Sequence, residues 1–108
     1  MGWKAMRTDV IDAVGISEDG SLWIKPATAT FPYIYCEAME VHWDPQRLRL
    51  YGPKPREWSY VDWFKQIRDA AREQGVDLTL ERTTTWSGVD ADLQQAIIST
   101  ATSQDSVK

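Results

Sequence analysis

Hydrophobic and polar residues alternate over the first quarter of the chain, in the pattern of half-buried β-strands. Leu22 and Ile24 alternate with Trp23 and Lys25, and before them apolar residues recur at even spacing at positions 10, 14 and 16. A turn-forming run, Glu-Asp-Gly, separates the two stretches at positions 18–20. We therefore predict a β-hairpin over residues 8–24, with Leu22 and Ile24 facing the core.

A second hairpin is predicted over residues 39–51, where the alternation continues on both sides of a turn. Asp44 and Pro45 are the residues that a type I turn favours at its first two positions. The apolar side of the two arms is expected to consist of Met39, Val41, Trp43, Leu48 and Leu50. Residues 27–38, between the hairpins, contain strand-forming aromatics but also Thr30 and Pro32, which could open a short helix, so strand and helix both stay open.

The strongest local signal predicts a helix over residues 60–74. Ser59 stands three residues before Asp62, which is an acidic variant of the capping box, and Trp58 can pack on Trp63 as a hydrophobic staple. Gly75 should end the helix, because glycine readily adopts the left-handed conformation. The apolar stripe of this helix is expected to be Tyr60, Val61, Phe64, Ile67, Ala70 and Ala71.

Another strand is predicted over residues 76–80, and a final helix should begin at Ser87 or Asp90. The apolar positions with helical spacing in this last segment are Val89, Leu93, Ala96, Ile97 and Ala101. The order of elements predicts an α+β fold, with a mainly antiparallel sheet of about five strands and two helices packed on one face. We expect residues 1–101 to form a single α+β domain and the polar residues 102–108 to form a flexible C-terminal tail.

Tryptophan is unusually frequent, with six in 108 residues beside four Tyr and two Phe. One explanation is that tryptophan gives a small domain much buried area per residue. The alternative is that some aromatic residues line a pocket or a partner interface, where such residues are enriched. The candidates for that role are Tyr33, Tyr35, Trp43, Trp58 and Trp86.

A basic loop precedes the first predicted helix. Its Lys54 and Arg56 could hold an anionic group together with the helix N-terminus, although loops that only connect two elements carry such residues too. Arg47 and Arg49, on the preceding strand, could point toward the same end. The candidate residues for binding a ligand or a partner are therefore Tyr33, Tyr35, His42, Arg47, Lys54, Arg56, Trp58 and Trp86.

His42 is the single histidine of the chain. As a general base it would need a nearby carboxylate, and the sequence does not place Glu37, Glu40 or Asp44 next to it, so no catalytic residue is assigned. The lone Cys36 is expected to be a small core residue in a reducing compartment. Metal-ligand spacing, a glycine-rich phosphate loop and a nucleophile elbow are all missing from the sequence, so we expect neither a metal nor a cofactor.

The formal net charge of −4 is unevenly distributed, with −3 over residues 1–43, +3 over residues 44–72 and −4 over residues 73–108. This balance makes nucleic-acid binding through bulk electrostatics unfavourable, and it leaves room for a local anion site in the middle. The sequence has no apolar run of membrane-spanning length and no apolar signal segment. We therefore expect a cytoplasmic protein without a membrane partner.

Four short runs resemble small bacterial proteins of the kind encoded in integron gene cassettes. They are Asp19-Gly20-Ser21-Leu22, Trp43-Asp44-Pro45, and Pro53-Lys54-Pro55-Arg56-Glu57-Trp58-Ser59-Tyr60 with Asp62-Trp63-Phe64. The resemblance spans roughly residues 19–75 and consists of packing and turn residues, so it transfers no catalytic residue. It implies a free-standing bacterial cytoplasmic protein with an adaptive accessory role, often an oligomer.

Two kinds of function fit these features. The first is a non-catalytic binding or interaction module, expected as a homodimer, which holds a protein partner or a small anionic or aromatic ligand through its aromatic and Arg/Lys surface. The alternative is a small enzyme or small-ligand-binding protein with a pocket around His42 and Arg56. A third possibility, a neutraliser of a basic partner, follows from the acidic C-terminal third. An exposed aromatic patch would favour the first kind, and a covered strand face around His42 would favour the second.

Overall fold

A computed structural model of the chain describes residues 7–34, 40–53 and 59–105. Its longest strand, the ten-residue β1 (Arg7–Ile16), lies inside the sheet and pairs along both edges. One edge of β1 pairs antiparallel with β2 (Leu22–Pro26). The turn between them is closed by the Ser17 N–H, which donates to the Ser21 carbonyl at 2.9 Å. The first predicted hairpin is thus confirmed.

The opposite edge of β1 carries two short strands in succession. β5 (Val76–Thr79) pairs parallel with residues 7–10, and β6 (Thr85–Ser87) pairs parallel with residues 13–15. The α+β class is confirmed, and the described sheet is mixed, with these two parallel pairings beside three antiparallel ones. The sequence pattern did not predict β6, because three residues are too few to show a period.

The second hairpin is formed by β3 (His42–Asp44) and β4 (Arg49–Gly52), with β4 pairing antiparallel to β2. Asp44 Oδ1 accepts from the Gln46 N–H at 2.9 Å and the Arg47 N–H at 3.1 Å, as expected for an aspartate that opens a turn. The predicted apolar position of Leu48 is wrong. Leu48 belongs to the turn, with a φ of 56° and 46% exposure, because the connection is longer than a four-residue turn at 44–47.

Helix α1 (Tyr60–Glu73) begins where the sequence predicts, because the Ser59 hydroxyl accepts from the Asp62 N–H at 3.1 Å. It ends next to Gly75, which has a φ of 92°. Arg68, outside the predicted apolar stripe, is buried and donates through Nε to the Leu78 carbonyl at 2.9 Å, which ties α1 to β5. The predicted staple partner Trp58 lies outside the described residues.

Helix α2 (Ala91–Asp105) starts after Asp90, whose Oδ1 accepts from the Leu93 N–H at 2.8 Å. Of the two predicted starts, Ser87 is wrong because it belongs to β6. The predicted apolar stripe is also wrong at Ala96, which is exposed, whereas Ile97 is buried. The helix extends four residues into the segment predicted to be a tail, and the flexibility of that segment stays a prediction.

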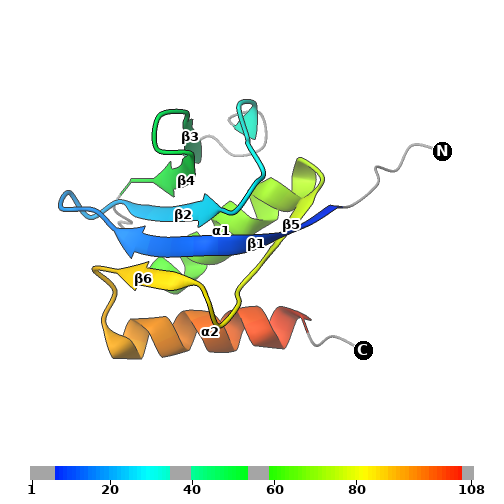
Figure 1. Cartoon of the computed structure of the whole chain (residues 1–108). Helices are drawn as coiled ribbons and strands as arrows, with labels where there is room; N and C mark the ends of the chain where they lie inside the picture. The colour runs from blue at the N-terminus through cyan, green and yellow to red at the C-terminus, as the bar shows by residue number, and fades with distance from the viewer. Residues whose placement is uncertain (1–6, 35–39, 54–58, 106–108) are drawn as a thin grey trace.

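Both helices lie on one face of the sheet, as predicted, and α2 packs beside α1 (Figure 1). The core between the layers is built from fully buried residues, among them Ile11, Val14, Leu22, Ile24, Leu50, Phe64, Ile67, Leu78 and Ile97. Of the segment left open by the sequence, residues 27–33 form a loop in which Phe31 is buried, and the Ile34 N–H then donates to the Phe31 carbonyl at 3.2 Å in a helical turn. Residues 35–38 lie outside the described residues, so the choice between strand and short helix stays open there. In the described residues no helix is long and apolar enough to cross a membrane.

Replacing Ser59 by alanine is expected to lower the free energy of unfolding by about 1 kcal/mol, because the Asp62 N–H loses its acceptor in the first turn of α1. Urea unfolding followed by far-ultraviolet circular dichroism measures this loss. Ser99→Ala is the matched control, since Ser99 is exposed within α2 and caps nothing. Equal stability of Ser59→Ala and the native chain would contradict the cap.

Candidate functional site

The face of the sheet opposite the helices carries aromatic and cationic side chains, and we call it the open face. In β2 and β4 the half-buried Trp23, Lys25, Arg49 and Tyr51 alternate with core residues and so point away from the helices. Within residues 7–34, 40–53 and 59–105, no helix or strand covers this face. The open face is therefore available to a ligand or a partner in the described part of the chain.

The strand register places Gly15, Trp23, Tyr51 and His42 in one row across β1, β2, β4 and β3. Gly15 gives the Trp23 indole room to lie on β1, because a Cβ at that position would be 2.2 Å from Trp23 Cζ2. The guanidinium carbon of Arg49 lies 4.4 Å from the centroid of the Trp23 ring. Trp23 is thus held between the β1 backbone and the Arg49 cation, in a cation–π arrangement.

At the end of the same row, the His42 ring packs on the Tyr51 ring. The two centroids are 5.2 Å apart and the planes are tilted by 31°. His42 is exposed and Tyr51 is half-buried. The two rings form a partly solvent-exposed aromatic edge and not an enclosed pocket.

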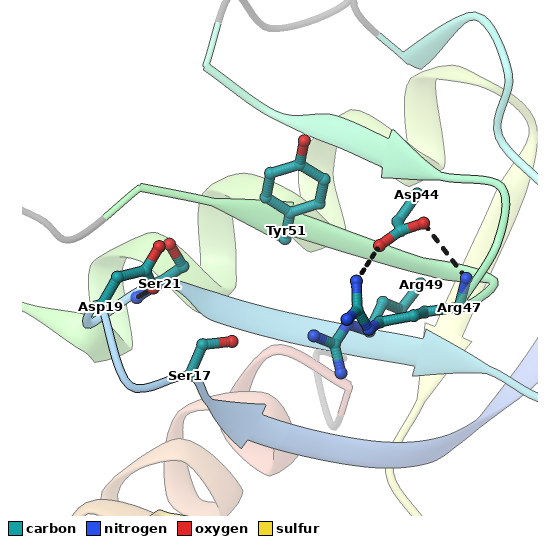
Figure 2. Close-up of a pocket in the computed structure, with 7 residues that line it drawn as sticks. All are labelled: Ser17, Asp19, Ser21, Asp44, Arg47, Arg49 and Tyr51. Atoms are coloured by element: carbon teal, nitrogen blue, oxygen red, sulfur yellow. Dashed lines mark hydrogen bonds and ion pairs between the residues drawn. The ribbon is translucent and has the colours of Figure 1, made fainter.

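A polar hollow of about 300 Å³ lies on the open face between the β1–β2 turn and the β3–β4 turn (Figure 2). Its walls come from these two turns and from β4, and its lining residues are Ser17, Asp19, Ser21, Asp44, Arg47, Arg49 and Tyr51. In Figure 2 the two arginine side chains extend together over β2 from the Asp44 side of the hollow. The hollow combines two cations, two carboxylates and three hydroxyl groups.

Both carboxylates of the hollow are engaged by their own turns. The Arg47 N–H is the main cause that lowers the pKa of Asp44, and the Gln46 N–H and the Arg47 guanidinium, at 3.3 Å, act in the same direction. The Ser21 N–H, which donates to Asp19 Oδ1 at 3.0 Å, is the main cause that lowers the pKa of Asp19. These two side chains are ionised at neutral pH and hold the turns that frame the hollow.

Arg49 is in a different situation from the carboxylates. Its guanidinium stacks on Trp23, and in the described residues it makes no hydrogen bond or ion pair. Burial and, secondly, the positive charge of Arg47 lower its pKa, while Asp44 acts in the opposite direction. Arginine nevertheless stays protonated at neutral pH, so the hollow contains a fixed cation whose donors face no protein acceptor in this part of the chain.

The structure brings together only some of the residues predicted from the sequence. His42 and Arg47 both belong to the β3–β4 hairpin of the open face, whereas the 62% exposed Tyr33 lies in the loop after β2. Trp86 is half-buried and packs against the core on the helix side of the sheet. The remaining candidates, Tyr35, Lys54, Arg56 and Trp58, lie outside the described residues.

The residues that sequence reasoning missed are mostly those whose neighbours depend on strand register. Trp23 lies on the side away from the core, as the alternation of β2 predicts, whereas the sequence suggests for Arg49 only a position near the basic loop. Their contact joins residues 26 positions apart and follows from the pairing of β2 with β4. The alternation of the two strands gives the face of each residue, but not its neighbour on that face.

No group of three or more His, Cys, Asp or Glu side chains that could hold a metal ion occurs within the described residues. The donor set of the hollow, with two guanidinium groups beside two carboxylates already engaged by turns, also does not suit a cation.

Comparisons with known proteins identify the family. Residues 9–84 match the family model described as Integron Cassette Protein Hfx_Cass5. A solved structure of an integron cassette protein, Hfx_Cass5 from the mobile metagenome of North West Arm Sewage Outfall, is 41% identical in sequence to this chain. The match covers 91% of this chain and 99% of that one, with a TM-score of 0.46.

No match to this chain was found among curated proteins. The family model spans more than two thirds of the chain and confirms the resemblance that the turn and packing residues indicated. This chain belongs to the Hfx_Cass5 family of integron cassette proteins.

Proposed function

We propose that this chain is a non-catalytic binding module and that the open face of its sheet is the binding surface. The observation that carries the proposal is the row of Trp23, Tyr51 and His42 with Arg49 stacked above it, on a face that no helix covers in the described residues. Aromatic residues and arginine are the types enriched at binding interfaces, because they combine large contact area with directed polar groups.

The small-enzyme alternative around His42 and Arg56 has less support. The His42 side chain is exposed, and its described neighbour is the Tyr51 ring rather than a carboxylate or a nucleophile. A general base needs a partner within hydrogen-bond reach of the reacting group. These surroundings favour His42 as a residue that contacts a ligand or partner over His42 as a residue that transfers a proton.

Fluorine NMR of the chain labelled with 5-fluorotryptophan tests the proposal. Trp23 reports on the open face, whereas Trp63 and Trp86 pack against the core on the helix side. Trp23→Phe assigns the Trp23 resonance. We expect self-association on concentration, or binding of members of a small-molecule library, to shift the Trp23 resonance and leave those of Trp63 and Trp86 in place.

Light scattering after size-exclusion chromatography gives the oligomeric state needed to interpret these spectra. If the chain is a homodimer, as the sequence leads us to expect, and the open face is its interface, Tyr51→Ala should shift it toward monomer. Shifts confined to Trp63 and Trp86 would place the binding surface on the helix side and would contradict the proposal. A Trp23 resonance that responds neither to concentration nor to any library member would contradict it as well.

A further inference from the structure

Among the described residues of the open face, Arg49 is a cation that the fold positions without giving it an acceptor. Arg49 is held by stacking on Trp23, which itself lies on Gly15, so its guanidinium is positioned by a cation–π contact and not by a hydrogen bond in the described residues. A guanidinium has five N–H donors in a planar fork, which matches the oxygens of a carboxylate or phosphate. In the described residues these donors have no hydrogen-bond partner.

A second cation lies close to the first. Arg47 comes from the β3–β4 turn and lines the same hollow as Arg49 (Figure 2), and its positive charge is one of the causes that lower the pKa of Arg49. Two guanidinium groups side by side repel each other, and an anion between them removes that repulsion. Arg47 uses one N–H on Asp44 Oδ2 at 3.3 Å, and its side chain is 65% exposed, so further donors remain for a ligand.

The two carboxylates of the hollow do not cancel this preference. Asp44 already accepts from Gln46, from the Arg47 backbone and from the Arg47 side chain, and Asp19 accepts from the Ser21 N–H. Ser17, Ser21 and Tyr51 add hydroxyl groups that can donate to an oxyanion. The free hydrogen-bonding capacity of the hollow is therefore weighted toward donors.

We propose that the hollow between the two turns binds the oxyanion group of a small molecule, a carboxylate or a phosphate, with Arg49 as its main contact and Arg47 as the second. The proposal rests on the open face being a binding surface and names the class of ligand. The hollow, about 300 Å³, lies at the small end of the range for ligand sites. Charged hydrogen bonds from a pre-positioned guanidinium are among the stronger polar contacts in proteins.

Isothermal titration calorimetry of the full chain with inorganic phosphate and, separately, with succinate tests the site. We expect at least one of them to bind, and Arg49→Gln to weaken that binding at least tenfold, as the loss of a charged hydrogen bond implies. Arg82→Gln is the matched control. Arg82 is exposed in the turn before β6 and does not line the hollow, so its removal should change the affinity less than twofold.

Arg49→Lys separates the geometry of the guanidinium from its charge. It keeps a cation but loses the planar fork, and we expect it to recover only part of the lost affinity. Thermal melting of each variant shows whether it is folded. Binding of phosphate alone, of succinate alone or of both would support the site and identify the group that it takes.

Two results would overturn the oxyanion site. One is that neither probe binds the native chain, and the other is that Arg82→Gln weakens binding as much as Arg49→Gln, which would indicate diffuse charge attraction. If the site fails while the Trp23 resonance still responds to self-association or to other molecules, the binding-module proposal stands. If the oxyanion site fails and the Trp23 resonance also responds neither to concentration nor to any molecule tested, both proposals fail.

Discussion

Replacing Asp9 by alanine is expected to lower the free energy of unfolding by about 2–3 kcal/mol, because buried donors then lose their acceptor. Asp9 is 7% exposed on β1. Its Oδ2 accepts from the Thr28 N–H at 3.0 Å and the Ala29 N–H at 2.9 Å, and its Oδ1 accepts from the Thr28 hydroxyl at 3.0 Å. One carboxylate thereby ties the loop that follows β2 to β1.

The matched control is Asp12→Ala on the same strand, since the Asp12 side chain is exposed. An exposed substitution of this kind usually changes stability by less than about 0.5 kcal/mol. Urea unfolding at pH 7 measures both variants. Equal effects of the two substitutions would show that the loop does not depend on the Asp9 carboxylate.

The stabilisation by Asp9 should also depend on pH with a defined sign. Burial by itself raises the pKa of Asp9, but the N–H groups of Thr28 and Ala29, the Thr28 hydroxyl and the Arg7 charge together hold it below the usual value of 3.8. A carboxyl group with a lowered folded-state pKa stabilises fully above its unfolded-state pKa, and the stabilisation is lost as pH falls through the folded-state value. The stability difference between the native chain and Asp9→Ala should therefore be constant near neutral pH and shrink below about pH 4.

The sequence predicts best the elements whose signals are local. The start of α1 follows from Ser59 and Asp62, three positions apart, and the turn at Asp44 follows from two adjacent residues. Helix caps and tight turns are decided by side chains that bond to backbone groups within a few positions. Such features can be read without knowing which strands pair.

Elements that depend on distant pairing could not be predicted in the same way. β6 has three residues, and it exists because residues 13–15 of the long β1 extend beyond β5 and leave an edge to pair with. The role of Asp9 depends on the loop residues Thr28 and Ala29, about twenty positions away. The type of an acidic residue on a strand does not reveal such partners, even when the residue is buried, as Asp9 is.

The candidate site has the same limitation. The alternation of apolar and polar residues places Trp23 and Arg49 on the side of their strands away from the core. Only the pairing of β2 with β4 brings the Arg49 guanidinium over the Trp23 ring. The sequence also gives no signal for the role of Gly15, since this glycine lies within β1 and not at a predicted turn. Its contribution is space for an indole that comes from the neighbouring strand.

Replacing Gly15 by valine should therefore affect both fold and site. We expect a loss of about 1–3 kcal/mol in the free energy of unfolding, because the new side chain needs the space held by the Trp23 ring. Displacing Trp23 also removes the surface on which Arg49 rests, at 4.4 Å from the ring centroid. If the oxyanion site exists, its affinity should fall in Gly15→Val about as far as in Arg49→Gln.

A double-mutant cycle identifies the clash, since residues in contact show non-additive effects. Trp23→Ala vacates the space beside Gly15, so adding Gly15→Val to it should cost much less than Gly15→Val costs in the native chain. Chemical denaturation of the native chain, the two single variants and the double variant gives the four free energies required. If the two losses in unfolding free energy simply add, the valine clashes with a group other than Trp23. The packing of Trp23 on Gly15 would then not determine where Arg49 lies on the open face.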